Sequence, residues 1–314
     1  MTFSELCDEI IQHYDDARDF AKILKAVYLG EFEHIKKENM EKYNIIEKDD
    51  LLFYGKNRPI FKSLTFFNEI PIFRKEEDSI LFLKDIGIPP SKTLNSLTYE
   101  EKIKLRNEFL NISKTIIPRE YFSHVPKLIF GKEYYFKDVC LKEYVSALNG
   151  IYKIGNKRKV IELIINRKIP EEKDVIKYRK ILAKRINLFN KKLDDYEIRN
   201  FNINFNGKNF KCQYIYIRQT VWDKILGLFG EGIELKYYPT LVNITYSSKK
   251  VDFLKPFFIF IDIDKNISVY ARVPKLLYLK HGLSLNYLKL KGKTTYFGNW
   301  ERDKFWKIIE KGSL

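Results

Sequence analysis

The C-terminal part of the chain combines two kinds of side chain that could bind a polyanion. Lys291-Gly292-Lys293-Thr294 is a basic loop that contains glycine, and its lysines are suited to contact the backbone of a nucleic acid. Aromatic residues cluster in the same region: Tyr214, Tyr216, Tyr237, Tyr238, Tyr270, Tyr278, Tyr296 and Phe297. Bases stack on such rings without sequence preference, while neighbouring lysines hold the phosphates. We expect most of these rings to be core, and we predict Lys291, Lys293 and Tyr296 as contacts.

The same basic loop is similar to the end of a phosphate-binding P-loop, but it lacks the other parts of that motif. Tyr287 stands where the first glycine is needed, and no suitable strand precedes the loop. ATP binding is therefore not expected, and we predict no cofactor.

Residues that could hold a metal ion are scattered. Asp262-Ile263-Asp264 places two carboxylates at the end of a strand, a pattern that is more typical of a buried strand entering a turn than of a metal site. The histidines are isolated, and the cysteines form no CxxC pair: His13, His34, His124 and His281, with Cys7, Cys140 and Cys212. This spacing argues against a zinc site and against a disulfide scaffold. We predict no metal ligand and no catalytic residue.

Composition favours a folded protein with a polyanionic partner. The 314 residues, 45% of them hydrophobic, suffice for one large or two ordinary domains. The formal net charge of +16 suits DNA or RNA. A heat-adapted surface is the alternative, and it would explain the amount of charge but not its sign.

The N-terminus and the longest apolar run give no sign of export or of a membrane span. Glu5, Asp8 and Glu9 lie where a signal peptide needs basic and then apolar residues, and Phe257 to Ile261 is far too short to cross a bilayer. We expect a cytoplasmic protein with no membrane role.

The N-terminal part is predicted to be mostly helical. Apolar residues recur at helical spacing over residues 3–11 and 20–27, and Gly30 is expected to end the second helix. A further helix is expected at 35–42 and an extended segment at 51–54. Thr98 followed by Glu101 is a capping box that starts another helix, which we interpret as part of a helical insertion.

The C-terminal part is predicted to be rich in strands. A long amphipathic helix from Pro170 to Leu193 precedes it. Strands at 200–205 and 210–217 flank Asn206-Gly207, a dipeptide that closes tight hairpins. Further elements are expected in this order: a helix at 221–229, strands at 241–246, 257–263 and 267–273, and a last helix at 302–310. The strand at 257–263 is expected to be buried on both faces because its apolar run does not alternate.

The order of several short motifs resembles that of the archaeal RecJ-like phosphodiesterases of the DHH superfamily. Leu52-Phe53-Tyr54-Gly55, Arg58-Pro59 and Phe82-Leu83-Lys84-Asp85-Ile86-Gly87 are similar to segments from the middle of that family. The collinear segments are Leu24 to Glu31, Leu52 to Leu64, Phe82 to Ile88, Leu97 to Leu105, Leu141 to Gly155 and Pro170 to Leu193.

The C-terminal part resembles the DHHA1 domain that accompanies this family. Phe257 to Ile263, Tyr270-Ala271-Arg272 and Leu277 to Leu285 match its strand, its Ser-Ala-Arg element and its following helix. The resemblance implies that Arg272 contacts a phosphate of single-stranded DNA, a task that suits the donor fork of a guanidinium, and we add Lys275 to the predicted contacts.

The resemblance also implies a fold class and a division into domains. The fold is α/β, with a helix-rich remnant of a DHH domain, a long connecting helix and an α/β DHHA1-like domain. The expected bounds are 1–169 for a truncated DHH-like domain with a helical insertion, 170–198 for the connecting helix and 199–314 for the nucleic-acid-binding domain.

The departures from the family determine the predicted function. The Asp-His-His triplet that binds manganese or magnesium has no counterpart, because this sequence starts where that half should be ending, and Glu31 alone stands at the family's Asp position. Two-metal hydrolysis needs several converging oxygen and imidazole ligands. The family's Gly-Gly-Gly-His signature is also replaced, by the shorter basic loop 292–298. The resemblance therefore implies a catalytically inactive protein that binds single-stranded DNA or RNA and works with GINS or replicative helicase proteins in replication or repair.

Two alternatives stay open. The protein could be an enzyme, namely a metal-dependent, single-strand-specific exonuclease whose metal-binding half is missing from this sequence or supplied by another chain. It could also be an RNA-binding module, because only RNA offers the 2′-hydroxyl.

Overall fold

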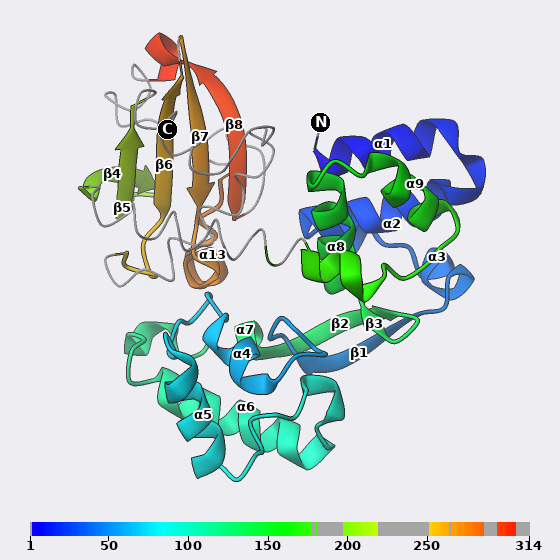
Figure 1. Cartoon of the computed structure of the whole chain (residues 1–314). Helices are drawn as coiled ribbons and strands as arrows, with labels where there is room; N and C mark the ends of the chain where they lie inside the picture. Colours follow the sequence, from blue (N-terminus) through cyan, green and yellow to red (C-terminus); the bar gives the residue numbers. More distant parts are fainter. Residues whose placement is uncertain are drawn as a thin grey trace. The chain divides into compact units, whose positions relative to one another are not determined.

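The computed structural model describes residues 2–177, 180, 197–218, 251–263, 265–285 and 294–305. Helices and two sheets make this a mixed α/β protein, as expected (Figure 1). The chain divides into two compact units. Unit 1 consists of Met1–Leu52 and Phe130–Lys184, and unit 2 consists of Phe53–Ile129 and Arg185–Leu314. The boundary expected from the sequence lies at residue 169 instead, which assigns residues 53–129 to the N-terminal domain.

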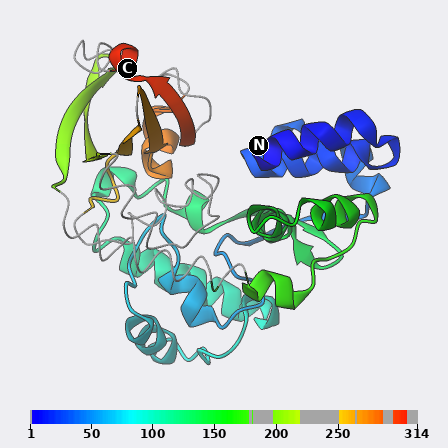
Figure 2. The same cartoon turned by 45° about the horizontal axis from the view of Figure 1, so that its top comes forward.

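Unit 1 begins with a helical hairpin, visible as a pair in Figures 1 and 2. Helix α1 (Phe3–His13) starts at a capping box in which the Thr2 hydroxyl accepts from the Glu5 amide and the Glu5 carboxylate accepts from the Thr2 amide. Helix α2 (Arg18–Leu29) ends at Gly30, whose φ of 75° lies in the left-handed region. Both predicted helices are confirmed. The short 3-10 turns are η1 (Asp15–Ala17) and η2 (Phe32–His34).

A three-stranded antiparallel sheet follows, in the order β1-β2-β3. Helix α3 (Lys37–Lys42) leads into β1 (Ile45–Leu51), which pairs with β2 (Phe130–Phe136). The expectation of an extended segment at 51–54 was wrong, because the strand lies at Ile45–Leu51 and ends where it was expected to begin. Its charged middle carries no strand pattern, and the pairing partner lies far away in the sequence.

The second segment of unit 1 completes its hydrophobic core. Strand β3 (Val139–Cys140) leads into α8 (Leu141–Lys153), and α9 (Lys157–Ile165) follows. The core is apolar and includes packed aromatic rings: Phe20 lies 5.2, 5.0 and 6.2 Å from Tyr43, Phe136 and Tyr144, measured between ring centroids.

Unit 2 combines a helical segment with a sheet. The helices are α4 (Ile60–Thr65), α5 (Glu76–Asp85), α6 (Tyr99–Ser113) and α7 (Pro126–Ile129), with 3-10 turns η3 (Leu94–Ser96) and η4 (Arg119–Tyr121). The predicted capping box at the start of α6 is confirmed, because the Glu101 amide donates to the Thr98 hydroxyl at 3.2 Å and the Thr98 amide donates to Glu101 at 2.9 Å. Phe109 packs against Phe53, Phe67 and Phe73.

Among the described residues, the sheet of unit 2 has five strands in sequence order (Figure 1). They are β4 (Arg199–Phe205), β5 (Lys208–Ile217), β6 (Phe257–Ile263), β7 (Asn266–Arg272) and β8 (Thr295–Glu301). Neighbours pair antiparallel except β5 and β6, which are parallel. The predicted hairpin turn at Asn206-Gly207 is confirmed, with φ values of 50° and 74°. The residues of β6 from Phe257 to Ile261 are buried, as their unbroken apolar run predicted.

Several expected elements lie partly or wholly outside the described residues. The helix at 221–229 and the strand at 241–246 lie there, as do most of the expected helix at 170–193 and the end of the last helix. Residues 172–177 and 302–305, which belong to these two helices, are helical.

Candidate nucleic-acid interface

Two of the predicted contacts, Arg272 and Lys275, are positioned by the end of β7 and the start of α13 (Lys275–His281). Strand β7 is an interior strand of the sheet, paired with β6 and β8. The backbone of Arg272, at the end of β7, is therefore held by pairing on both sides. The Val273 amide donates to the Thr294 carbonyl at 2.8 Å, and Pro274 then caps α13. Only Val273 and Pro274 separate Arg272 from Lys275, so the two cations lie close together in the sequence at the junction of β7 and α13.

Both cations bind the same carboxylate, that of Glu69. Arg272 Nη2 lies 3.0 Å from Glu69 Oε2, and Lys275 Nζ lies 3.1 Å from Glu69 Oε1. Burial opposes ionisation of Glu69, but the charges of Lys275 and Arg272 outweigh it and lower the pKa of Glu69 to about 2. The side chains of Arg272 and Glu69 are 6% and 18% exposed, whereas that of Lys275 is 51% exposed. Arg272 is thus enclosed, and Lys275 is the cation that faces solvent.

The low pKa of Glu69 predicts an acid-dependent loss of stability in unit 2. The ion pairs stabilise the fold fully above the ordinary pKa of 4.5, and this contribution is lost as the pH falls from about 4.5 to about 2. The difference between these pKa values corresponds to about 3 kcal/mol. Chemical denaturation over this pH range measures it.

Glu69→Gln provides the control for this pH dependence, because glutamine does not titrate. The difference in free energy of unfolding between the wild type and Glu69→Gln should shrink as the pH falls through that window. A difference that stays constant down to about pH 2 would contradict the assignment of the acid transition to Glu69.

The opposite end of α13 brings a second cation to an aromatic ring. Lys280 Nζ lies 4.3 Å from the centroid of the Tyr121 ring and 3.8 Å from Glu120 Oε1. The ring of His281 lies 5.2 Å from that of Phe210, and burial, with help from Lys208, lowers the pKa of His281. Glu69, Lys280 and Tyr121 were not predicted from the sequence, because no local pattern links residues of the helical segment to the C-terminal sheet.

The other predicted contacts are described incompletely. Lys291 and Lys293 lie outside the residues that the structure describes. The backbone of Tyr296 pairs with Ala271 in the β7–β8 ladder, beside the end of β7 that carries Arg272. Of the aromatic residues singled out in the sequence, Tyr270 is fully buried and belongs to the core.

The carboxylate of Asp262, part of the Asp262-Ile263-Asp264 pattern, is bound by protein groups. The Tyr216 hydroxyl and the Arg302 guanidinium both donate to it. Burial and the hydrogen bond to Asp262 raise the pKa of Tyr216 to about 12. Asp264 lies outside the described residues. Across the described ranges, no group of three or more His, Cys, Asp or Glu residues could hold a metal ion.

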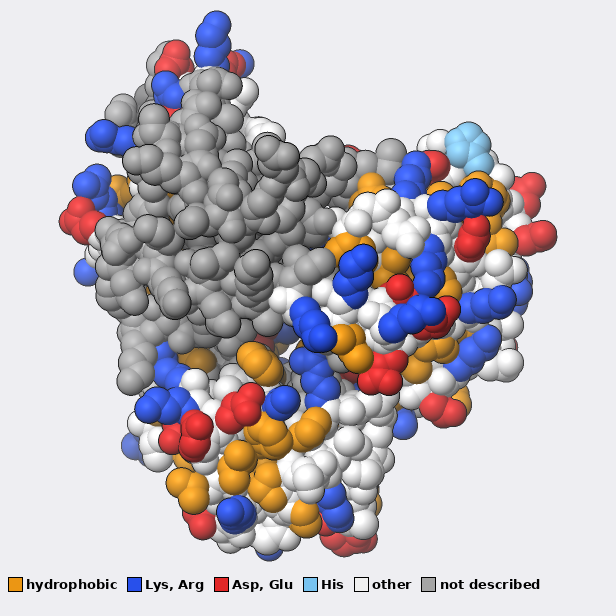
Figure 3. Space-filling model, viewed as in Figure 1, with side chains coloured by type: hydrophobic (Ala, Val, Ile, Leu, Met, Phe, Trp, Pro, Cys, Tyr) orange, Lys and Arg blue, Asp and Glu red, His pale blue; other side chains and the backbone are white. Residues whose placement is uncertain are grey.

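Charge on the visible surface is mixed. On the face in Figure 3, lysine and arginine side chains are interspersed with acidic ones rather than gathered in one field. Hydrophobic side chains gather in the lower part of this view, over the segment of α4 to α6. None of the helices among the described residues is long and apolar enough to cross a membrane.

The fold and this cluster define a mixed α/β protein whose second unit joins a helical segment to a five-stranded sheet through a shared carboxylate. No protein-family model matches the chain. The chain is 70% identical, over the full length of both proteins, to the uncharacterized protein MJ1071 of Methanocaldococcus jannaschii. It belongs to the same family as that protein.

Among solved structures, CDC45 from Entamoeba histolytica is similar at a TM-score of 0.44 and 12% sequence identity. The match covers 97% of this chain and 69% of that one. A likeness at this level establishes neither a shared fold nor a shared function.

Proposed function

We propose that the chain is a RecJ-like protein that binds single-stranded nucleic acid through unit 2 without cleaving it, and that it acts as a structural partner in DNA replication or repair. The observation that carries the proposal is the convergence of Arg272 and Lys275 on the carboxylate of Glu69. The carboxylate of Glu69 is an oxyanion, as a phosphate group is. Two cations that contact one carboxylate are therefore spaced so that both could contact one phosphate.

The arrangement suggests separate roles for the two cations. Arg272 is enclosed and keeps the start of α13 in place through Glu69, so its role is positioning. Lys275 is half exposed and can exchange one of its contacts for a phosphate oxygen. The basic residues Lys291 and Lys293 of the following loop would extend the contact along the strand, and the net charge of +16 favours the encounter with a polyanion.

Lys275→Gln should weaken binding of a fluorescently labelled single-stranded oligonucleotide by about three- to tenfold, because one charged phosphate contact is lost. The salt dependence of the affinity should also become shallower by about 0.7, the value for one phosphate contact on a single strand. Fluorescence polarisation at several salt concentrations measures both quantities. Folding should be preserved, because Arg272 still neutralises Glu69.

Lys84→Gln on α5 is the matched control, because it removes the same charge from an exposed position in the same unit. An equal loss of affinity in Lys84→Gln and Lys275→Gln would mean that net charge alone governs binding. The absence of any binding to single strands at low salt would overturn the proposal. Competition between matched DNA and RNA strands distinguishes the two nucleic acids.

Absence of cleavage is proposed because the sequence contains no Asp-His-His triplet. The alternative is a metal-dependent exonuclease completed by residues outside this sequence. Degradation of end-labelled single strands in the presence of Mn²⁺ would favour that alternative, and the reading frame upstream of Met1 provides an independent check.

A role as a structural partner requires a surface for other proteins, such as GINS or replicative helicase proteins. Phe66 and Leu81, at the end of α4 and on α5, are 53% and 58% exposed and offer apolar contacts to another protein. Co-purification of the full chain with GINS tests this part of the proposal. Failure to co-purify would remove the partnership while leaving nucleic-acid binding in place.

A further inference from the structure

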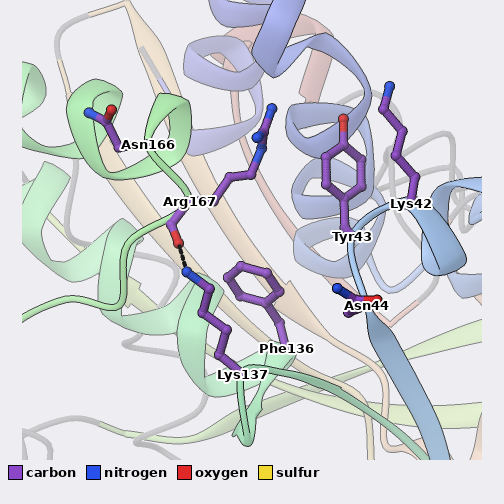
Figure 4. A pocket seen from close by; sticks show the side chains of 7 residues that line it. All are labelled: Lys42, Tyr43, Asn44, Phe136, Lys137, Asn166 and Arg167. Atoms are coloured by element: carbon purple, nitrogen blue, oxygen red, sulfur yellow. Dashed lines mark hydrogen bonds between the residues drawn. The ribbon is translucent and has the colours of Figure 1, made fainter.

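A pocket in unit 1 is lined by cations and amides. It has a volume of about 340 Å³, and its lining consists of Lys42, Tyr43, Asn44, Phe136, Lys137, Asn166 and Arg167 (Figure 4). Three of these side chains are cationic and none is acidic. The volume lies at the lower end of the range found for small-molecule sites, about 300–1,000 Å³.

The lining supplies hydrogen-bond donors that the fold does not use fully. Arg167 Nη2 donates to the Asp16 carbonyl at 2.7 Å, but Arg167 Nε is buried without a hydrogen-bond partner. The hydroxyl of Tyr43 is also buried without a hydrogen-bond partner, and the residue as a whole is only 6% exposed. Unpaired buried donors are rare because they have lost water without compensation, and a ligand with acceptor oxygens would satisfy both of these.

The donors lie close together. The guanidinium carbon of Arg167 is 5.3 Å from the centroid of the Tyr43 ring, and Lys42 Nζ is also 5.3 Å from it. Figure 4 shows the side chains of Lys42, Tyr43 and Arg167 extending in the same direction, so that ammonium, hydroxyl and guanidinium end side by side. Lys42 is additionally held by Asp19 at 3.0 Å, and Lys137 Nζ donates to the Arg167 carbonyl at 2.8 Å.

Left-handed backbone conformations gather at the same place, one of them in the turn between β2 and β3. Five non-glycine residues of the described chain have positive φ, and three of them, Asn44, Lys137 and Arg167, line this pocket. Arg167 has a φ of 53° just after α9, a position where helices usually place glycine. A long cation at this position costs stability, and such strain is typical of sites that are kept for a ligand.

We propose that this pocket binds the phosphate group of a small phosphorylated ligand. Lys42, Arg167 and Lys137 supply positive charge, the Tyr43 hydroxyl and the neighbouring amides donate hydrogen bonds, and a phosphate accepts from all of them without donating. The site is independent of the nucleic-acid contacts proposed for unit 2.

Arg167→Gly is the decisive variant, because it separates binding from folding. Glycine adopts a positive φ without strain, which offsets the lost hydrogen bond to the Asp16 carbonyl, so the thermal midpoint of the unliganded protein should change little. Affinity for inorganic phosphate and for adenosine 5′-monophosphate should nevertheless fall by about tenfold or more, because a charge-assisted donor is lost. Calorimetric titration and thermal shift at constant ionic strength measure the two quantities.

Two further variants strengthen the test. Lys137→Asn removes a cation, and asparagine tolerates the left-handed backbone, so binding should weaken without unfolding. Tyr43→Phe should leave the unliganded protein as stable or more stable, because its hydroxyl has no protein partner, and should weaken phosphate binding. Lys168→Gln, an exposed neighbour outside the lining, is the matched control and should bind like the wild type.

The outcomes are distinct. Tighter binding of adenosine 5′-monophosphate than of phosphate supports the proposal and identifies a nucleotide-like ligand, and equal binding supports it for the phosphate group alone. No binding of either probe up to about 10 mM, well beyond the millimolar range of weak ligands, would overturn the proposal. Equal affinity in Arg167→Gly and the wild type would also overturn it, as would an equal loss in Lys168→Gln.

Discussion

Arg272→Ala is expected to lower the free energy of unfolding of unit 2 by about 3–5 kcal/mol, the range observed when one partner of a buried ion pair is removed. The guanidinium is 6% exposed and lies 3.0 Å from the carboxylate of Glu69. Without it, Glu69 keeps a charge in a largely enclosed site with Lys275 as its remaining cation. Urea denaturation followed by circular dichroism measures the change.

A double-mutant cycle shows how much of this loss belongs to the pair. Arg272→Ala and Glu69→Ala together should cost less than the sum of the two single changes, because the double variant leaves no buried charge unpaired and the remaining cation, Lys275, is half exposed. Additive effects would mean that Arg272 stabilises unit 2 through packing alone.

Phe20→Ala is expected to destabilise unit 1 by about 3–5 kcal/mol, the typical cost of truncating a fully buried phenylalanine. Phe20 is 0% exposed, and its ring contacts those of Tyr43, Phe136 and Tyr144. Alanine would leave a cavity between α2 and the sheet that surrounding rings can fill only in part. The free energy of unfolding, obtained from a denaturant titration, gives the loss.

Leu29→Ala on the same helix is the matched control, because its side chain is 43% exposed and its truncation should change stability by no more than about 0.5 kcal/mol. Comparable costs for the two variants would contradict the assignment of Phe20 to the core. Because Tyr43 packs on Phe20 and also lines the pocket of unit 1, Phe20→Ala should in addition weaken phosphate binding.

Locally encoded elements were predictable. Helix α2 ends at Gly30, α6 begins at the capping box of Thr98 and Glu101, and the β4–β5 hairpin turns at Asn206-Gly207. In each case, residues within a few positions of one another satisfy the backbone or set its φ, so the pattern suffices. The buried strand β6 was predictable for a related reason, since an unbroken apolar run requires cover on both faces.

Elements that depend on distant partners were not predictable. Strand β1 carries the charged run 47–50, and it forms because it pairs with β2, in the register of Ile46 with Tyr135. The expected strand at 51–54 was therefore misplaced. The joining of residues 53–129 to the C-terminal segment had no sequence signal either, because it includes ion pairs between Glu69 and residues about two hundred positions later.

The sequence by itself determined the mixed α/β class, the end of α2, the start of α6 and the excess of positive charge, because these follow from local periodicity, capping and composition. Tertiary structure decided what the cations contact. Arg272, expected at a phosphate, is enclosed and paired with Glu69, and Lys42, Lys137 and Arg167, which no motif singled out, line one pocket. Electrostatic interactions depend on distance and burial, and only the folded chain sets these two quantities.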